Sequence, residues 1–124
     1  MKLYSVNAAL KNRNQLHGDR IYIEGLLSFE FENISISHWP KAEQEGSGVW
    51  IAESNGVFKF NTDALEKLAG KKVVCLGQFQ SSFESDMFDG PWGFGHFGLW
   101  SAQIVATEIV YYKKWHIANG TSET

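Results

Sequence analysis

The residues that could do acid–base, nucleophilic or metal chemistry are few and scattered. The four histidines, at positions 17, 38, 96 and 116, lack the His-x-His or His-Glu-x-x-His spacing that directs two imidazoles to one metal. Cys75 lies in an apolar run and is interpreted as a small core residue, not as an activated thiolate. Asp63 and Glu66 suit a helix end better than a catalytic pair. We therefore expect no enzyme activity, no metal site and no cofactor.

A different chemistry, stacking on aromatic rings, is concentrated in the glycine-rich segment 83–100. Its candidate binding residues are Phe88, Trp92, Phe94, His96, Phe97 and Trp100. Aromatic faces on a loop can stack on sugars or on bases, and each base stack contributes about 1–3 kcal/mol. The same rings could instead fold over the open end of a small barrel and fill it, with glycine permitting the tight turns. Both interpretations remain open from the sequence.

The charge balance argues against nucleic acid as the partner. Eleven lysine and arginine residues stand against fourteen acidic ones, a net charge of −3. Binding to phosphates needs a clustered positive field, but the aromatic segment contains Glu84, Asp86 and Asp89. Basic residues gather near 11–20, 71–72 and 113–114, and their order in the chain does not say whether these groups meet. A protein partner or a second copy of the chain is the favoured contact.

Size and composition predict one globular domain over residues 1–124. The chain is 44% hydrophobic and 20% charged, which is typical of a folded protein. It contains no apolar run as long as the roughly 18 residues that a membrane-spanning helix needs, so we expect no membrane association. The N-terminus shows no export signal, and the single cysteine agrees with a reducing compartment. The expected location is cytoplasmic.

Hydrophobic alternation and turn residues then predict the elements that must position these groups. The first half of the chain is predicted to contain a short N-terminal helix over about 5–16, a long strand over 20–32 that bends at Gly25, and an extra strand or arm over 34–39. A hairpin of strands 49–54 and 57–60 follows around Asn55-Gly56. The rest is predicted to form a short helix that ends at Gly70, strands over 73–80 and 99–112, and a flexible tail over about 114–124. A bent first strand that joins two sheets is typical of a small five-stranded Greek-key barrel. The predicted fold is therefore mainly β, with the barrel over about 18–112 and the helix between its third and fourth strands.

Two stretches carry a resemblance to a known family. Residues 18–26 read Gly-Asp-Arg-Ile-Tyr-Ile-Glu-Gly-Leu, and residues 65–74 read Leu-Glu-Lys-Leu-Ala-Gly-Lys-Lys-Val-Val, with Gly77 shortly after them. These stretches resemble the first-strand and helix-to-fourth-strand signatures of OB-fold domains. The chain is especially similar to small bacterial OB-fold proteins of the anticodon-binding-like and periplasmic-type groups.

The resemblance implies a binding face on the second and third barrel strands, walled by loops at about 33–48 and 81–98. It adds Tyr22, Trp50 and Phe58 to the candidate binding residues. The expected function is a non-catalytic binding or interaction module that contacts a protein partner, or itself, through the aromatic loop. The alternative is binding of single-stranded nucleic acid or an oligosaccharide on the barrel face.

Overall fold

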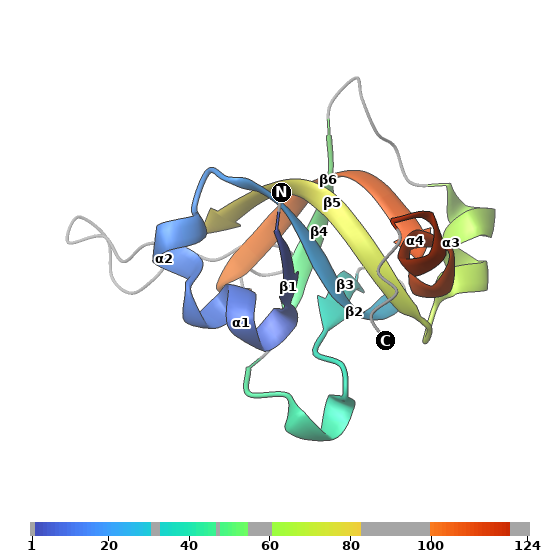
Figure 1. Ribbon diagram of the computed structural model, residues 1–124, viewed down its shortest axis with the longest axis horizontal. Coiled ribbons are helices and arrows are strands. Elements are labelled where there is room, and N and C mark those ends of the chain that lie inside the picture. Colours follow the sequence, from blue (N-terminus) through green and yellow to red (C-terminus); the bar gives the residue numbers. More distant parts are fainter. Residues whose placement is uncertain (1, 31–32, 47, 55–60, 83–99, 120–124) are drawn as a thin grey trace.

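The computed structural model describes residues 2–30, 33–46, 48–54, 61–82 and 100–119 (Figure 1). Its elements are β1 (Leu3–Ser5), α1 (Val6–Lys11), α2 (Arg13–Leu16), β2 (Arg20–Glu30), β3 (Asn33–Ser37), the 3₁₀ turn η1 (Lys41–Glu43), β4 (Val49–Glu53), α3 (Thr62–Leu68), β5 (Lys72–Ser81), β6 (Ala102–Tyr111) and α4 (Tyr112–Ala118). Helices α1 and α2 lie toward one end of the barrel, and α3 and α4 lie at the other.

Five of the strands form a closed barrel, which confirms the predicted fold class. The strand order is β2-β3-β4-β6-β5, and β5 pairs again with β2 to close the ring. The β4–β6 pair is parallel, with Trp50 opposite Gln103, and the other pairs within the barrel are antiparallel. This topology is compatible with an OB-fold-like barrel.

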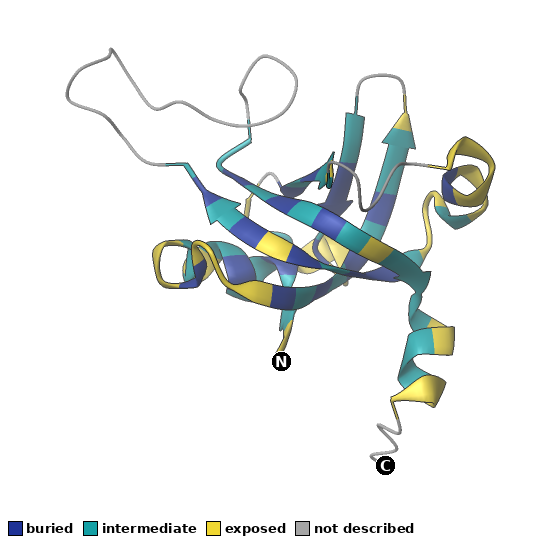
Figure 2. Ribbon diagram, turned by 90° about the horizontal axis from the view of Figure 1, so that it is seen from above, coloured by how far each residue is buried: buried dark blue, intermediate teal, exposed yellow. Residues whose placement is uncertain are grey.

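Strand β2 closes the barrel because it takes part in two pairings. Its N-terminal half pairs with β5 and its C-terminal half with β3, and Leu26 has a partner in both strands. The predicted alternation is observed, since Ile21, Ile23 and Leu27 are buried while their neighbours are half-buried or exposed. Figure 2 shows buried positions alternating with less buried ones along the strands of the barrel. Gly25 lies where the strand changes partners. A Cβ atom there would overlap the carbonyl oxygen of Ser37, so the bend depends on the missing side chain.

The barrel interior forms one apolar core that includes residues from the first helices and from α3. Its fully buried large side chains include Phe79, Ile23, Leu27, Ile36, Ile51 and Ile104. Val6 and Ala9 of α1 and Leu65 of α3 add to it from outside the sheet. Helices α1 and α3 therefore pack against the same core as the barrel strands.

Two side-chain caps and one glycine define the ends of α1 and α3, and the predicted stop at Gly70 is confirmed. The Ser5 side chain accepts a hydrogen bond from the backbone N–H of Ala8 at 3.2 Å and caps α1. The side chain of Asn61 accepts a hydrogen bond from the backbone N–H of Ala64 at 3.2 Å and caps the start of α3. Gly70 follows α3 with a φ of +79°, a backbone conformation that glycine adopts without strain.

The structure corrects the placement of the extra strand. The segment expected as an addition over 34–39 is β3, and it is a regular member of the barrel between β2 and β4. The strand outside the barrel is β1, which pairs in parallel with β2 through Leu3 and Tyr22. Three residues are too few to show a strand alternation, which is why β1 was not predicted. The expected hairpin arm over 57–60 lies outside the described residues.

Both ends of the chain also differ from expectation. The predicted N-terminal helix consists of two short helices separated at Asn12, whose φ and ψ of −106° and 21° interrupt α1. Residues 114–118 of the predicted flexible tail instead belong to a helix, α4, which begins at Tyr112. Its Trp115 ring packs edge-on against Tyr22 with centroids 5.5 Å apart, so α4 is anchored to the barrel by an aromatic contact.

Candidate functional site

Four side chains form a row across the outside of the barrel. The pairing registers place Ser35 of β3 opposite Trp50 of β4, Trp50 opposite Gln103 of β6, and Gln103 opposite Gln80 of β5. Paired residues project to the same side of a sheet, and their neighbours along each strand project to the other. Those neighbours form the buried interior: Ile36, Val49, Ile51, Ile104 and Phe79. The row therefore projects to the outer side of the sheet, which we call the Trp50 face. Ser35 is buried there, and Trp50, Gln103 and Gln80 are half-buried.

Two tryptophans meet on this face. The rings of Trp50 and Trp100 have centroids 5.9 Å apart and an interplanar angle of 47°, within the range of a favourable aromatic contact. Both are half-buried. Gly48 makes room for them, because its φ is +94° and a Cβ there would lie 2.7 Å from the carbonyl oxygen of Ile36 and 3.4 Å from Cζ3 of Trp100. A side chain at position 48 would therefore crowd the backbone of β3 and the Trp100 ring.

Amide side chains continue the row beside the tryptophans. Nε2 of Gln103 donates to Oε1 of Gln80 at 2.5 Å, and Nε2 of Gln78 donates to the carbonyl oxygen of Gly18 at 3.3 Å. An amide offers both donors and acceptors, so these groups suit a ligand that carries hydroxyl groups. The row contains no charged side chain: its members are serine, tryptophan and two glutamines.

The predicted site residues fall into three groups. Trp50 and Trp100, predicted for different reasons, come together on the Trp50 face. Tyr22 does not join them, because it projects from β2 toward Trp115 of α4. The remaining candidates lie outside the described residues: Phe58, Phe88, Trp92, Phe94, His96 and Phe97.

Gln80 and Gln103 are the site residues that sequence reasoning missed. Each is a half-buried polar residue between two buried residues, in the patterns of β5 and β6. The alternation of these strands predicts that both project outward. It does not predict that they are neighbours, because their register depends on how β5 and β6 pair.

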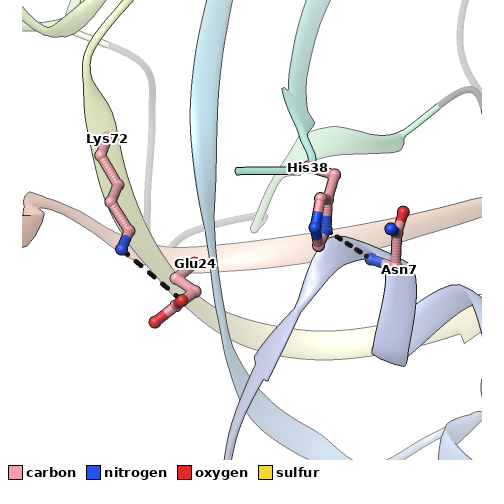
Figure 3. A network of polar contacts seen from close by, with 4 residues as sticks. All are labelled: Asn7, Glu24, His38 and Lys72. Carbon is pink, nitrogen blue, oxygen red and sulfur yellow. Dashed lines mark hydrogen bonds and ion pairs between the residues drawn. The ribbon is translucent and has the colours of Figure 1, made fainter. Parts of the chain in front are cut away.

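The described histidines and the cysteine take part in structural contacts. Nδ1 of His17 accepts a hydrogen bond from the backbone N–H of Ser81 at 2.9 Å. Nδ1 of the buried His38 accepts from the N–H of Asn7 at 3.2 Å (Figure 3). His116 stacks on Tyr112 with centroids 5.5 Å apart. Burial raises the pKa of the Cys75 thiol, which disfavours the reactive thiolate.

Two further features bear on function. Within the described part of the chain, no three histidine, cysteine, aspartate or glutamate residues gather in a way that could hold a metal ion. None of the helices described there is long and apolar enough to cross a membrane.

A comparison with models of protein families and a comparison with curated proteins each give no match to this chain.

Proposed function

We propose that the chain is a non-catalytic binding module of the OB-fold type that binds an uncharged oligosaccharide on the Trp50 face. The observation that carries the proposal is the placement of Trp50, whose ring contacts that of Trp100, in one cross-strand row with Gln103 and Gln80. Aromatic rings and neutral amides thus share one outer surface of a rigid barrel.

The chemistry of sugars explains why this ligand class fits best. A pyranose ring has an apolar face of C–H groups that packs on an indole ring, and its rim of hydroxyl groups both donates and accepts hydrogen bonds. The two tryptophans match the first property, and the amides of Gln80 and Gln103 match the second. Phosphates need basic partners, which the row does not contain. A neutral sugar chain therefore suits this face better than a nucleic acid.

Tryptophan fluorescence during titration with neutral oligosaccharides tests the proposal. We would use cellohexaose, laminarihexaose and maltohexaose as probes, with Trp50→Ala as the test variant. Trp39→Ala is the matched control, because Trp39 is an exposed tryptophan outside the row. Loss of a stacked indole should weaken binding by about 1–2 kcal/mol, on the order of tenfold, and the control should leave it unchanged. Equal weakening by both variants, or no binding of any probe, would overturn the proposal.

Contact with a protein partner, or with a second copy of the chain, through the aromatic loop stays a prediction. The loop residues 83–99 lie outside the described part of the structure, so this function is supported by the sequence. Light scattering of the wild type and of Trp92→Ala tests it. A wild-type oligomer that dissociates in the variant, at unchanged thermal stability, would support the loop as an interface. The cytoplasmic location likewise stays a prediction.

A further inference from the structure

The end of the barrel formed by α3 and α4 gathers lysines around aromatic rings. The register of β5 and β6 places Val73 opposite Tyr111, so the lysines that precede Val73 lie beside the residues that follow Tyr111. Lys71, Lys72 and Lys113 line a hollow of about 310 Å³ that also contains Trp39, Tyr111 and Tyr112. The two basic groups that are far apart in the sequence therefore meet in space.

A second hollow, of about 460 Å³, adjoins the first. Lys67 of α3 and Lys114 of α4 line it together with Asp63 and with Tyr111, which belongs to both hollows. The two hollows share Tyr111, and we call the surface that includes both of them the lysine end. It contains five of the eleven lysine and arginine residues of the chain.

The lysines and the rings of this surface are interleaved. Nζ of Lys72 lies 3.8 Å from the ring centroid of Tyr112 and 5.7 Å from that of Trp39, and Nζ of Lys71 lies 5.7 Å from that of Tyr111. Trp39 is 45% exposed, so a large part of its ring is accessible to a ligand. Aromatic rings beside lysines are the combination that binds single strands, because bases stack on the rings while phosphates meet the ammonium groups.

The local charge is opposite in sign to that of the whole chain. Three carboxylates offset part of it: Asp63 in the second hollow, Glu66 beside Lys67 on α3, and Glu24, which pairs with Lys72 at 3.7 Å (Figure 3). Five lysines against three carboxylates leave a local excess of about two positive charges. The field of a charge is screened within about 8–10 Å at moderate salt. The acidic residues elsewhere therefore do not cancel this patch, although the net charge of −3 argued against such a ligand.

We propose that the lysine end binds single-stranded nucleic acid. Trp39 provides the base-stacking surface, and the exposed lysines Lys71 and Lys113 contact phosphates on either side of Tyr111. This site is separate from the Trp50 face, because Gln103 and Tyr111 are eight residues apart on β6, about 26 Å along a strand. A result that overturns one of the two proposals therefore leaves the other unaffected.

Fluorescence anisotropy with a labelled oligothymidylate of about 12 nucleotides tests this site. The full chain would be compared with Lys71→Glu, Lys113→Glu and Trp39→Ala. The matched control is Lys11→Glu, which makes the same change of charge at an exposed residue of α1, toward the other end of the barrel. Thermal unfolding of every variant checks that it is folded.

The two phosphate contacts of Lys71 and Lys113 with a single strand predict a salt slope near −1.4, so affinity should fall about sevenfold between about 50 and 200 mM salt. Each lysine variant should weaken binding and reduce the slope by about 0.7. Trp39→Ala should weaken it about fivefold or more, while Lys11→Glu should have little effect.

Three results would overturn the proposal. They are no binding at low salt, equal weakening by Lys11→Glu and Lys71→Glu, and tighter binding of a polyglutamate peptide or of a DNA duplex of the same length. The peptide result would instead identify an acidic protein segment as the ligand of this end. The duplex result would remove the role of base stacking on Trp39.

Discussion

Replacing Gly25 by alanine tests how the barrel is closed. A Cβ atom at this position would overlap the carbonyl oxygen of Ser37 and would lie 2.8 Å from Cγ1 of Ile36 and 3.1 Å from Cγ2 of Val6. Two of the obstacles are side chains, but the Ser37 oxygen belongs to the backbone of β3. The methyl group therefore fits only if β2 and β3 move apart.

The expected loss of folding stability depends on the kind of atom that must move. Overpacking a core costs about 1–3 kcal/mol, and a backbone obstacle places Gly25→Ala toward the upper end, at about 2–3 kcal/mol. For 124 residues, an unfolding entropy of about 2.1 cal/mol/K per residue converts 1 kcal/mol into about 4 °C. Gly25→Ala should therefore lower Tm by about 8–12 °C.

Gly46→Ala is the matched control for this substitution. A Cβ there would meet only Cδ1 of Leu10, at 3.4 Å, so the side chain has room, and the loss of glycine freedom in the unfolded chain should leave stability equal or slightly higher. Calorimetry and urea unfolding of both variants measure the difference. A Gly25→Ala protein as stable as the wild type, or equal shifts in both variants, would refute the account of β2 as a strand bent at a position that excludes a side chain.

Three further outcomes are expected. Cys75 should react with Ellman's reagent only after urea unfolding, because its side chain is buried and burial raises the pKa of its thiol; fast reaction in the native protein would contradict this. Phe79→Ala should cost about 3–5 kcal/mol, since Phe79 is fully buried in the core, whereas Ile117→Ala, at an 80% exposed residue, should change the free energy of unfolding by less than about 0.5 kcal/mol. Asn61→Ala should lose about 1 kcal/mol of helix capping and Asn61→Asp should retain it, and equal urea midpoints for the two variants would count against the cap.

The parts of the fold that were predictable are those encoded by near neighbours in the chain. The alternation of 20–30 depends only on which residues are apolar, and the cap of α3 depends on Asn61 and the N–H three residues later. The barrel followed from these elements and their order. The role of β3 did not, because a five-residue alternation says that a strand exists but not which strands it pairs with.

The candidate site was predictable in its members but not in its assembly. Trp50 was expected from a strand face and Trp100 from an aromatic segment. Their contact depends on the parallel pairing of β4 with β6, which joins segments about fifty residues apart and leaves no local pattern. The meeting of Lys71 with Lys113 depends in the same way on the register of β5 and β6.

The most direct test of the central claim is a nuclear magnetic resonance titration that follows the indole N–H signals. With the neutral oligosaccharide that binds most tightly among the three probes, the signals of Trp50 and Trp100 should shift together, because the two rings form one contact on one face. Those of Trp39 and Trp115, which lie at the lysine end and against Tyr22, should stay in place. Shifts confined to Trp39 and Trp115, with Trp50 and Trp100 unchanged, would contradict the assignment of the Trp50 face as the sugar-binding surface.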